Sequence, residues 1–169
     1  MLVMTALFAS LTCVVTMSIR IPSPLNGYLN LGDCVILLAG WLLSPVHGFL
    51  AAGIGSALAD LFAGYVLYAP ITFVIKGAMA LTAFWLFRLL YKRIGSLLSR
   101  ILSGFASEAV MILGYFLFES IMYGFAPSAV NIPANALQGA AGLILGIILI
   151  KMLEKTKIIS NSNIRSKLS

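Results

Sequence analysis

The sequence predicts an all-α integral membrane protein with a single domain of six transmembrane helices. Hydrophobic residues make up 61% of the 169 residues, and charged residues make up only 9%. Globular proteins carry about one quarter charged residues, so a soluble chain of this composition would lack a polar surface. A helical span needs about 20 apolar residues. The chain therefore has room for five or six crossings.

Apolar runs separated by turn formers or by basic residues mark the expected spans. The runs are Leu2–Ile19, Leu31–Leu43, Val46–Gly64, Ala69–Phe87, Ile101–Met122 and Val130–Ile150. The second run would rise only ~20 Å, which leaves open whether it crosses the membrane or re-enters on the same side. We expect one transmembrane domain over residues 1–157 and a polar cytoplasmic tail over residues 158–169.

Basic residues gather at two places and predict the orientation. One cluster is expected in a loop after the fourth run, and the other follows the last run: Arg88, Lys92, Arg93 and Arg100, then Lys151, Lys155, Lys157, Arg165 and Lys167. Segments rich in Lys and Arg stay cytoplasmic. With six spans, both termini are then expected on the cytoplasmic side of a prokaryotic plasma membrane. The net charge of +6 follows from this topology and needs no nucleic-acid partner.

Several kinds of chemistry are disfavoured by what the sequence lacks. Cys13 and Cys34 fall within or beside apolar runs, which indicates free thiols rather than a disulfide framework or a zinc cluster. The sequence contains no G-x-x-x-x-G-K-S/T, H-E-x-x-H or G-x-S-x-G pattern and no dinucleotide fingerprint. We therefore expect no catalytic residue, metal or cofactor. Uphill transport by this chain would need an energising partner or an ion gradient.

Four ionisable residues lie within the apolar runs, where a charge is expensive unless it faces protein, water or a ligand. They are Asp60, Lys76, Glu108 and Glu119. The predicted orientation brings Asp60, Lys76 and Glu119 to a similar depth near the outer face. Two interpretations stay open here, namely a structural Asp60–Lys76 pair and contacts with a ligand.

Polar side chains form one stripe on each of the last two runs. Spacings of seven and four, and then of four and three, place each set on one helix face: Glu108, Tyr115 and Glu119, followed by Asn131, Asn135 and Gln138. Such stripes can hold helices together. Amides and carboxylates beside aromatic rings also suit a small, planar, polar ligand. We favour the ligand, except at Glu108, where a structural role is at least as well supported.

The segment over residues 22–33 is rich in turn formers, yet it also carries Tyr28 and Asp33. This composition is typical of a lid rather than a simple connector. Asp33 lies where the second helix is expected to begin, so it is also a candidate N-cap. We favour the cap.

Three strings resemble, in order, the S-component family of energy-coupling-factor (ECF) transporters, and most of all its riboflavin-type branch. They are Gly27-Tyr28-Leu29-Asn30-Leu31-Gly32-Asp33, then GSALADLFAGY over residues 55–65, then Tyr68-Ala69-Pro70-Ile71-Thr72 with Lys76-Gly77. The likeness covers nearly the whole chain. It implies six helices with cytoplasmic termini, a genuine second crossing, and a vitamin site in the outer half under the first loop.

The resemblance also implies site residues and partners. Together with the polar stripes, it implies substrate contacts from Tyr28, Asn30, Lys76, Tyr115, Glu119, Asn131, Asn135 and Gln138. Family members dock on a membrane coupling subunit, driven by two ATPase subunits, through an Ala-x-x-x-Ala face on the first helix. The nearest matches are Ala6-x-x-x-Ser10 and Ala9-x-x-x-Cys13, which keep the small size but leave the register open.

The expected function is capture of a small heteroaromatic vitamin or precursor, with pyridoxine or hydroxymethylpyrimidine favoured over riboflavin or thiamine. One alternative is a membrane-embedded enzyme that uses Glu108 and Glu119 as an acid–base pair. These carboxylates are eleven residues apart on one helix, or ~16 Å, which is too far for one reacting centre. A self-assembling channel is disfavoured because no repeated pore-lining charge pattern is present.

Overall fold

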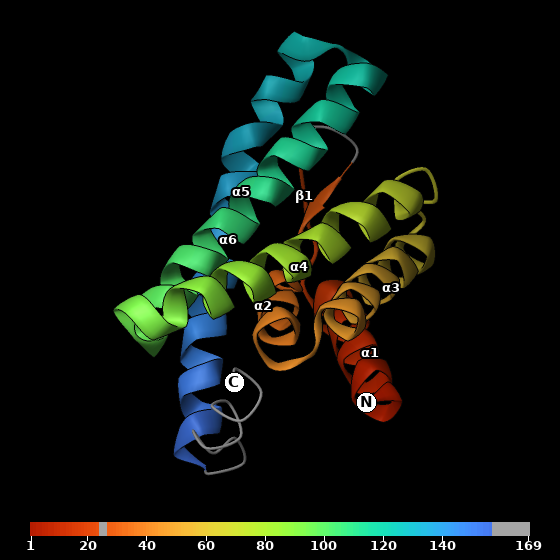
Figure 1. Ribbon diagram of the computed structural model, residues 1–169. Helices are drawn as coiled ribbons and strands as arrows, with labels where there is room; N and C mark the ends of the chain where they lie inside the picture. The colour runs from red at the N-terminus through yellow and green to blue at the C-terminus, as the bar shows by residue number, and fades with distance from the viewer. Residues whose placement is uncertain (24–26, 157–169) are drawn as a thin grey trace.

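The structure is a computed structural model that describes residues 1–23 and 27–156. Within this part the chain forms six helices and one short hairpin (Figure 1). The elements are α1 Leu2–Ser18, β1 Ile21–Pro22, β2 Tyr28–Leu29, α2 Asp33–Leu42, α3 Pro45–Ala63, α4 Ala69–Ile94, α5 Ser96–Tyr123 and α6 Phe125–Lys155. The predicted tail over residues 158–169 lies outside the described residues.

Four of the helices, α3 to α6, are long and apolar enough to cross a membrane, with 19, 26, 28 and 31 residues. Their outward faces carry large apolar side chains, such as Phe62, which is 67% exposed, and Ile121, which is 85% exposed. Lipid is the solvent that suits such faces, because all backbone polar groups are already paired within the helices. The prediction of an all-α membrane protein with six helices is confirmed.

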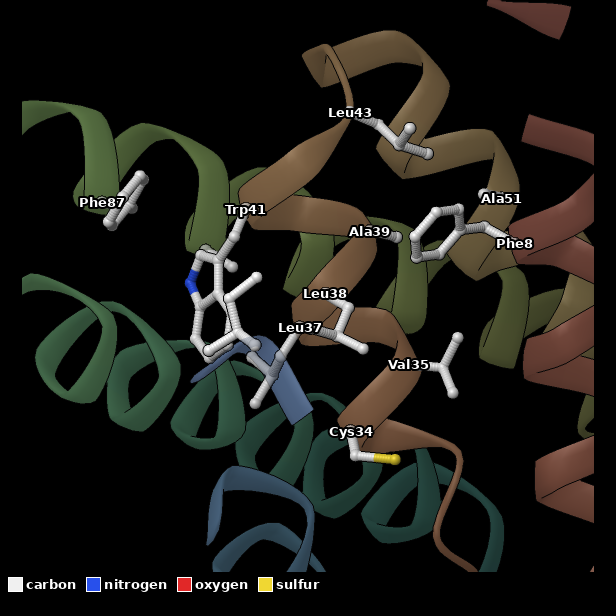
Figure 2. Packing of buried hydrophobic residues seen from close by; sticks show 12 residues of the cluster. Phe8, Cys34, Val35, Leu37, Leu38, Ala39, Trp41, Leu43, Ala51 and Phe87 are labelled. Atoms are coloured by element: carbon white, nitrogen blue, oxygen red, sulfur yellow. The ribbon is translucent and has the colours of Figure 1, made fainter. Parts of the chain in front are cut away.

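The short helix α2 lies inside the bundle. Its ten residues rise ~15 Å, which is half of a hydrocarbon core of about 30 Å. Nine of them, Asp33–Trp41, are buried. Figure 2 shows Phe8 of α1 and Ala51 of α3 on one side of α2, while Trp41 points to the other side, where Phe87 of α4 lies. A helix that is apolar all round is one that other helices surround.

The segment expected to make the second crossing consists of the hairpin followed by α2. Strands β1 and β2 pair antiparallel, with Pro22 opposite Tyr28. The hairpin lies near the end of the bundle where α3 ends and α4 begins (Figure 1). From there the chain continues to Asp33 and then as α2 to Leu42, beside the start of α3. This segment is therefore only partly helical, which agrees with its short apolar run.

The turn between α4 and α5 differs from the prediction. Both helices extend until Gly95 alone, with a φ of +79°, reverses the chain. Arg100, expected in a loop, lies on α5 and is 2% exposed. Its Nη1 is 2.8 Å from Glu154 Oε1 of α6, and its guanidinium lies 5.2 Å from the centre of the Phe87 ring. Lys and Arg are good helix formers, so a drop in hydropathy does not mark a helix end.

Small residues let α3 pack closely against both of its neighbours. A Cβ on Gly55 would collide with the carbonyl oxygen of Ala9 on α1. A Cβ on Gly53 would lie 2.8 Å from the carbonyl oxygen of Phe73 on α4. Only glycine permits these backbone approaches. The dense small residues of the third run therefore hold α3 between α1 and α4.

The helix ends place two accessible turns at opposite ends of the bundle. Loops next to Lys and Arg stay cytoplasmic, so the α4–α5 turn is predicted inside and the α3–α4 turn outside. A cysteine in Val66→Cys should react with a membrane-impermeant maleimide in intact cells. A cysteine in Ser96→Cys should react only after permeabilisation. The native Cys13 and Cys34 are buried and give the background; the reverse labelling pattern would invert the topology.

Candidate functional site

A cavity lies where the hairpin meets the end of α3, the start of α4, the end of α5 and the start of α6. Its empty volume is about 420 Å³, including the part open to solvent. Polar and aromatic side chains form its walls: Ser23, Gly27, Tyr28, Asn30, Asp60, Tyr65, Tyr68, Thr72, Tyr115, Glu119, Asn131, Asn135 and Gln138. This is a polar site at one end of a bundle whose other end is packed with apolar side chains.

Seven of the eight residues expected to bind a substrate line this cavity. The exception is Lys76, which lies beneath it and is 3% exposed. Its Nζ donates to Asp33 Oδ1 at 2.5 Å and lies 3.1 Å from the sulfur of Met111. The ring centre of Tyr115 is 5.6 Å from the same nitrogen. Lys76 therefore packs beneath the residues that line the cavity and does not itself line it.

The ion pair of Lys76 with Asp33 bears on two interpretations of the sequence, namely the Asp60–Lys76 pair, which was left open, and the cap role of Asp33, which was favoured. Lys76 pairs with Asp33 rather than with Asp60, because α2 brings Asp33 into the middle of the bundle, where it is fully buried. Asp33 is also not the N-cap of α2. Gly32 occupies that position, and Asn30 Oδ1 accepts a hydrogen bond from its backbone N–H at 2.9 Å. The Asp33 side chain is left free to face inward.

Gln138 of α6 joins the ion pair to the hairpin. Its Nε2 donates to Asp33 Oδ2 at 2.6 Å. Its Oε1 accepts from the backbone N–H of Asn30 at 2.9 Å and from the Asn30 side-chain amide at 3.4 Å. One amide therefore holds both α2 and the hairpin against α6. Movement of the hairpin would have to break these contacts.

Tyr28 fastens the other side of the hairpin to α3. Its O–H donates to Asp60 Oδ1 at 2.8 Å, and its ring centre lies 5.0 Å from that of Tyr65. Burial, and next the negative charge of Asp60, raise the pKa of Tyr28. The phenol stays protonated at neutral pH and remains a hydrogen-bond donor. The hairpin thus covers the cavity with a contact on each side.

Two acceptor atoms in the cavity wall lack a protein partner among the described residues. Asn131 Nδ2 donates to Glu119 Oε1 at 2.8 Å. The remaining oxygens, Glu119 Oε2 and Asn131 Oδ1, are buried and accept nothing. A buried acceptor without a donor costs free energy, so these two oxygens match a ligand that brings N–H or O–H groups.

Aromatic rings also line the cavity, and two of the four, Tyr65 and Tyr68, were not predicted from the sequence. Tyr68 stacks edge-on against Phe118 with ring centres 5.4 Å apart. Thr72 Oγ1 and Tyr115 Oη share a hydrogen bond of 3.1 Å. Tyr65, Tyr68 and Thr72 stand three and four residues apart. This spacing can put them on one side of a helix start, a signal that could have found them.

Glu108 and Glu119 serve different parts of the molecule. Glu119 lines the polar cavity, whereas Glu108 lines an apolar groove between α5 and α6. The polar stripe of α5 is therefore divided between two environments. No cavity of the described chain brings the two carboxylates together, so the geometry gives no support to an acid–base pair.

The small residues of α1 fall on two faces. Ala6 and Ser10 are exposed beside Leu7, which is 56% exposed. Ala9 and Cys13 are buried, 9% and 8% exposed, on the side that packs against α3. Of the two candidate pairs, Ala6 and Ser10 is the pair whose side chains are exposed.

Removing one partner of the buried ion pair should destabilise the fold. Lys76→Met leaves Asp33 without a counter-charge, and loss of one partner of a buried pair costs about 3–5 kcal/mol. Thermal unfolding of the purified protein in detergent measures the loss. The double variant Lys76→Met/Asp33→Asn should recover much of it, because no isolated charge remains. Unchanged stability of Lys76→Met would mean that the pair contributes nothing to folding.

Comparison with known proteins agrees with the fold. Residues 1–155 match the family described as ECF-type riboflavin transporter, S component. The chain is 39% identical over 136 residues to the "Uncharacterized protein in gap 3'region" of Pyrococcus woesei, covering 79% of this chain and 87% of that protein. It is 29% identical over 161 residues to the "Thiamine precursor transporter HmpT" of Lactococcus lactis subsp. cremoris (strain MG1363), covering 94% and 90%.

A solved structure has the same fold. It is described as "Structure and mechanism of the S component of a bacterial ECF transporter", and it superposes with a TM-score of 0.74 at 24% identity. The match covers 92% of this chain and 95% of that chain. On the match over residues 1–155, the chain belongs to the family of ECF-type riboflavin transporter S components.

Proposed function

We propose that this S component binds a single-ring heteroaromatic vitamin precursor of the hydroxymethylpyrimidine type in the cavity beneath the hairpin. The observation that carries the proposal is the pair of buried acceptors without donors, Glu119 Oε2 and Asn131 Oδ1. An aminopyrimidine with a hydroxymethyl group has both N–H and O–H donors on a flat ring. Its ring nitrogens can in turn accept from amides such as Asn135, which also lines the cavity.

The shape of the cavity supports a small ligand. Its empty volume of about 420 Å³ includes the part open to solvent, and the side chains of Tyr28, Tyr65, Tyr68 and Tyr115 line it. A narrow space between tyrosine rings suits a flat ring that stacks. Riboflavin has three fused rings and a sugar-alcohol chain, and thiamine has two rings and a fixed positive charge. Both would need the hairpin to open further than a single ring would.

A relative supports the same ligand class. The Lactococcus lactis protein, which is similar over 94% of this chain, is named a thiamine precursor transporter. Pyridoxine has a comparable single ring with O–H donors, but it lacks an exocyclic amine. Pyridoxine is therefore the second candidate. The group that distinguishes the two ligands is the exocyclic amine, whose N–H would donate a hydrogen bond to Asn131 Oδ1 or Glu119 Oε2.

Titration calorimetry of the purified chain tests the ligand. Hydroxymethylpyrimidine should bind more tightly than pyridoxine, thiamine or riboflavin. Glu119→Gln and Asn135→Ala should each weaken its binding by about ten- to a hundredfold, because a hydrogen bond to a charged group contributes about 1.5–3 kcal/mol and 1.4 kcal/mol is tenfold.

The matched control is Glu154→Gln, the same chemical change at the inner end of α6, away from the cavity. Its ligand affinity should equal that of the parent. If Glu119→Gln and Asn135→Ala also kept the parent affinity, the cavity would not be the binding site. If riboflavin bound most tightly, the site would stand and the proposed ligand class would fall.

We further propose that the chain delivers its ligand through an ECF module made of a membrane coupling subunit and two ATPases. The sequence carries no nucleotide-binding pattern, so ATP hydrolysis must come from partners. The exposed pair Ala6 and Ser10 supports docking through that face of α1, because small side chains let another helix approach closely.

Bulky substitutions on the two faces of α1 should have different effects. Ala6→Leu should lower ATP-driven uptake in vesicles that hold the whole complex, while the ligand affinity of the purified chain stays unchanged. Ala9→Leu should instead lower the unfolding temperature, because overpacking a buried site costs about 1–3 kcal/mol. Ala136→Leu makes the same change on an exposed position of α6 and should alter neither. Normal uptake by Ala6→Leu would exclude this docking face.

A further inference from the structure

A second cavity is a groove at the surface of the protein, between α5 and α6 and about halfway along their length. Its empty volume is about 670 Å³, including the part open to the surroundings. All of its lining residues except Glu108 are apolar, among them Phe105, Leu143 and Ile144. Glu108 stands ~18 Å from the start of α5 and ~22 Å from its end. The groove therefore faces hydrocarbon, and a carboxyl group forms part of its wall.

The Glu108 carboxyl group has no hydrogen-bond partner among the described residues. It is 5% exposed, and both of its oxygens are buried without a donor. The α6 backbone covers it, since a Cβ on Gly139 would lie 3.1 Å from Glu108 Oε2 and a Cβ on Gly142 would lie 3.4 Å from Oε1. Helix backbone N–H groups are already used within α6, so this surface offers no donor to a carboxylate.

The charged groups around Glu108 argue against an ionised carboxylate. Asp33 and Cys34 of α2 and Lys76 of α4 act on it electrostatically. Lys76 is already bound to Asp33 at 2.5 Å. α6 contributes only glycines and apolar side chains to this contact. An ionised Glu108 would leave a net negative charge in the centre of the membrane, where an uncompensated charge is expensive.

We propose that Glu108 is a proton-binding site in the middle of the membrane, occupied at neutral pH and reached from the lipid through the α5–α6 groove. The proton makes the cluster of Glu108, Asp33 and Lys76 neutral overall. With Glu108 uncharged, Asp33 remains the carboxylate that pairs with Lys76. Because Gln138 binds Asp33 on one side and the hairpin on the other, the proton on Glu108 keeps the hairpin contact intact.

Infrared spectroscopy tests the protonation directly. At neutral pH the spectrum of the parent minus that of Glu108→Gln should contain the C=O stretch of a protonated carboxylic acid. An ordinary glutamate, with a pKa near 4.3, is ionised at this pH. A difference spectrum that contains carboxylate bands instead would overturn the proposal. Equal unfolding temperatures of the two proteins would establish that the comparison concerns one fold.

A hydrophobic carbodiimide tests access from the lipid. In the reaction, the carboxyl proton moves to one carbodiimide nitrogen while the carboxyl oxygen bonds to the central carbon. The O-acylisourea then rearranges to an N-acylurea by acyl transfer to nitrogen. No atom leaves, so the peptide gains the mass of one reagent molecule. Dicyclohexylcarbodiimide should label Glu108 of the parent in lipid nanodiscs at neutral pH, and a water-soluble carbodiimide should not.

Two variants test whether the carbodiimide reaches Glu108 through the α5–α6 groove. Ala140→Leu fills the groove that Ala140 lines and should abolish the label, whereas Ala136→Leu, one turn away on the exposed side of α6, should leave it unchanged. If Glu108→Gln fails to fold, labelling of the parent protein still tests the proposal, because mass spectrometry identifies the residue that carries the adduct. An unlabelled Glu108, or label at Glu119 in its place, would overturn the lipid-accessible proton site.

Discussion

The buried ion pair between Lys76 and Asp33 is the contact on which the half of the structure that holds the cavity depends. Water reaches this depth of a membrane protein only where the protein forms a cavity. Each buried charge therefore needs a partner from the chain itself. The pair joins α4 to α2, and Gln138 of α6 binds the same carboxylate. Asn30 of the hairpin is then held by Gln138. The roof of the cavity is thus supported from the middle of the bundle.

The half of the molecule that holds the cavity is polar, and the other half is mainly apolar. The first half contains the cavity tyrosines and the acceptors without donors. In the second half, α2 is surrounded by apolar side chains (Figure 2). There Trp41 donates to Ser103 at 3.0 Å, and Arg100 pairs with Glu154 across α5 and α6.

Composition and periodicity were enough to predict the membrane class, the helices and the part of the cavity wall formed by Tyr115, Glu119, Asn131, Asn135 and Gln138. Tyr28 and Asn30 were predicted from the family resemblance. Apolar runs mark spans because lipid selects for them along the whole length of a helix. The stripe of Asn131, Asn135 and Gln138 was visible because helical spacing turns sequence distance into a shared face. The partner of Lys76 was not visible, since charge alone does not tell Asp33 from Asp60. Only the path of the hairpin and α2 brings Asp33 to the right depth.

The positions of the two tryptophans decide what an optical probe of this protein would report. Trp41 of α2 is buried, and Trp85 of α4 is 59% exposed. Neither lines the cavity. Emission from Trp85 therefore reports the surrounding lipid or detergent, and emission from Trp41 reports the packing around α2. A change in Trp41 emission on addition of a ligand would be evidence of helix rearrangement at a distance, not of direct contact.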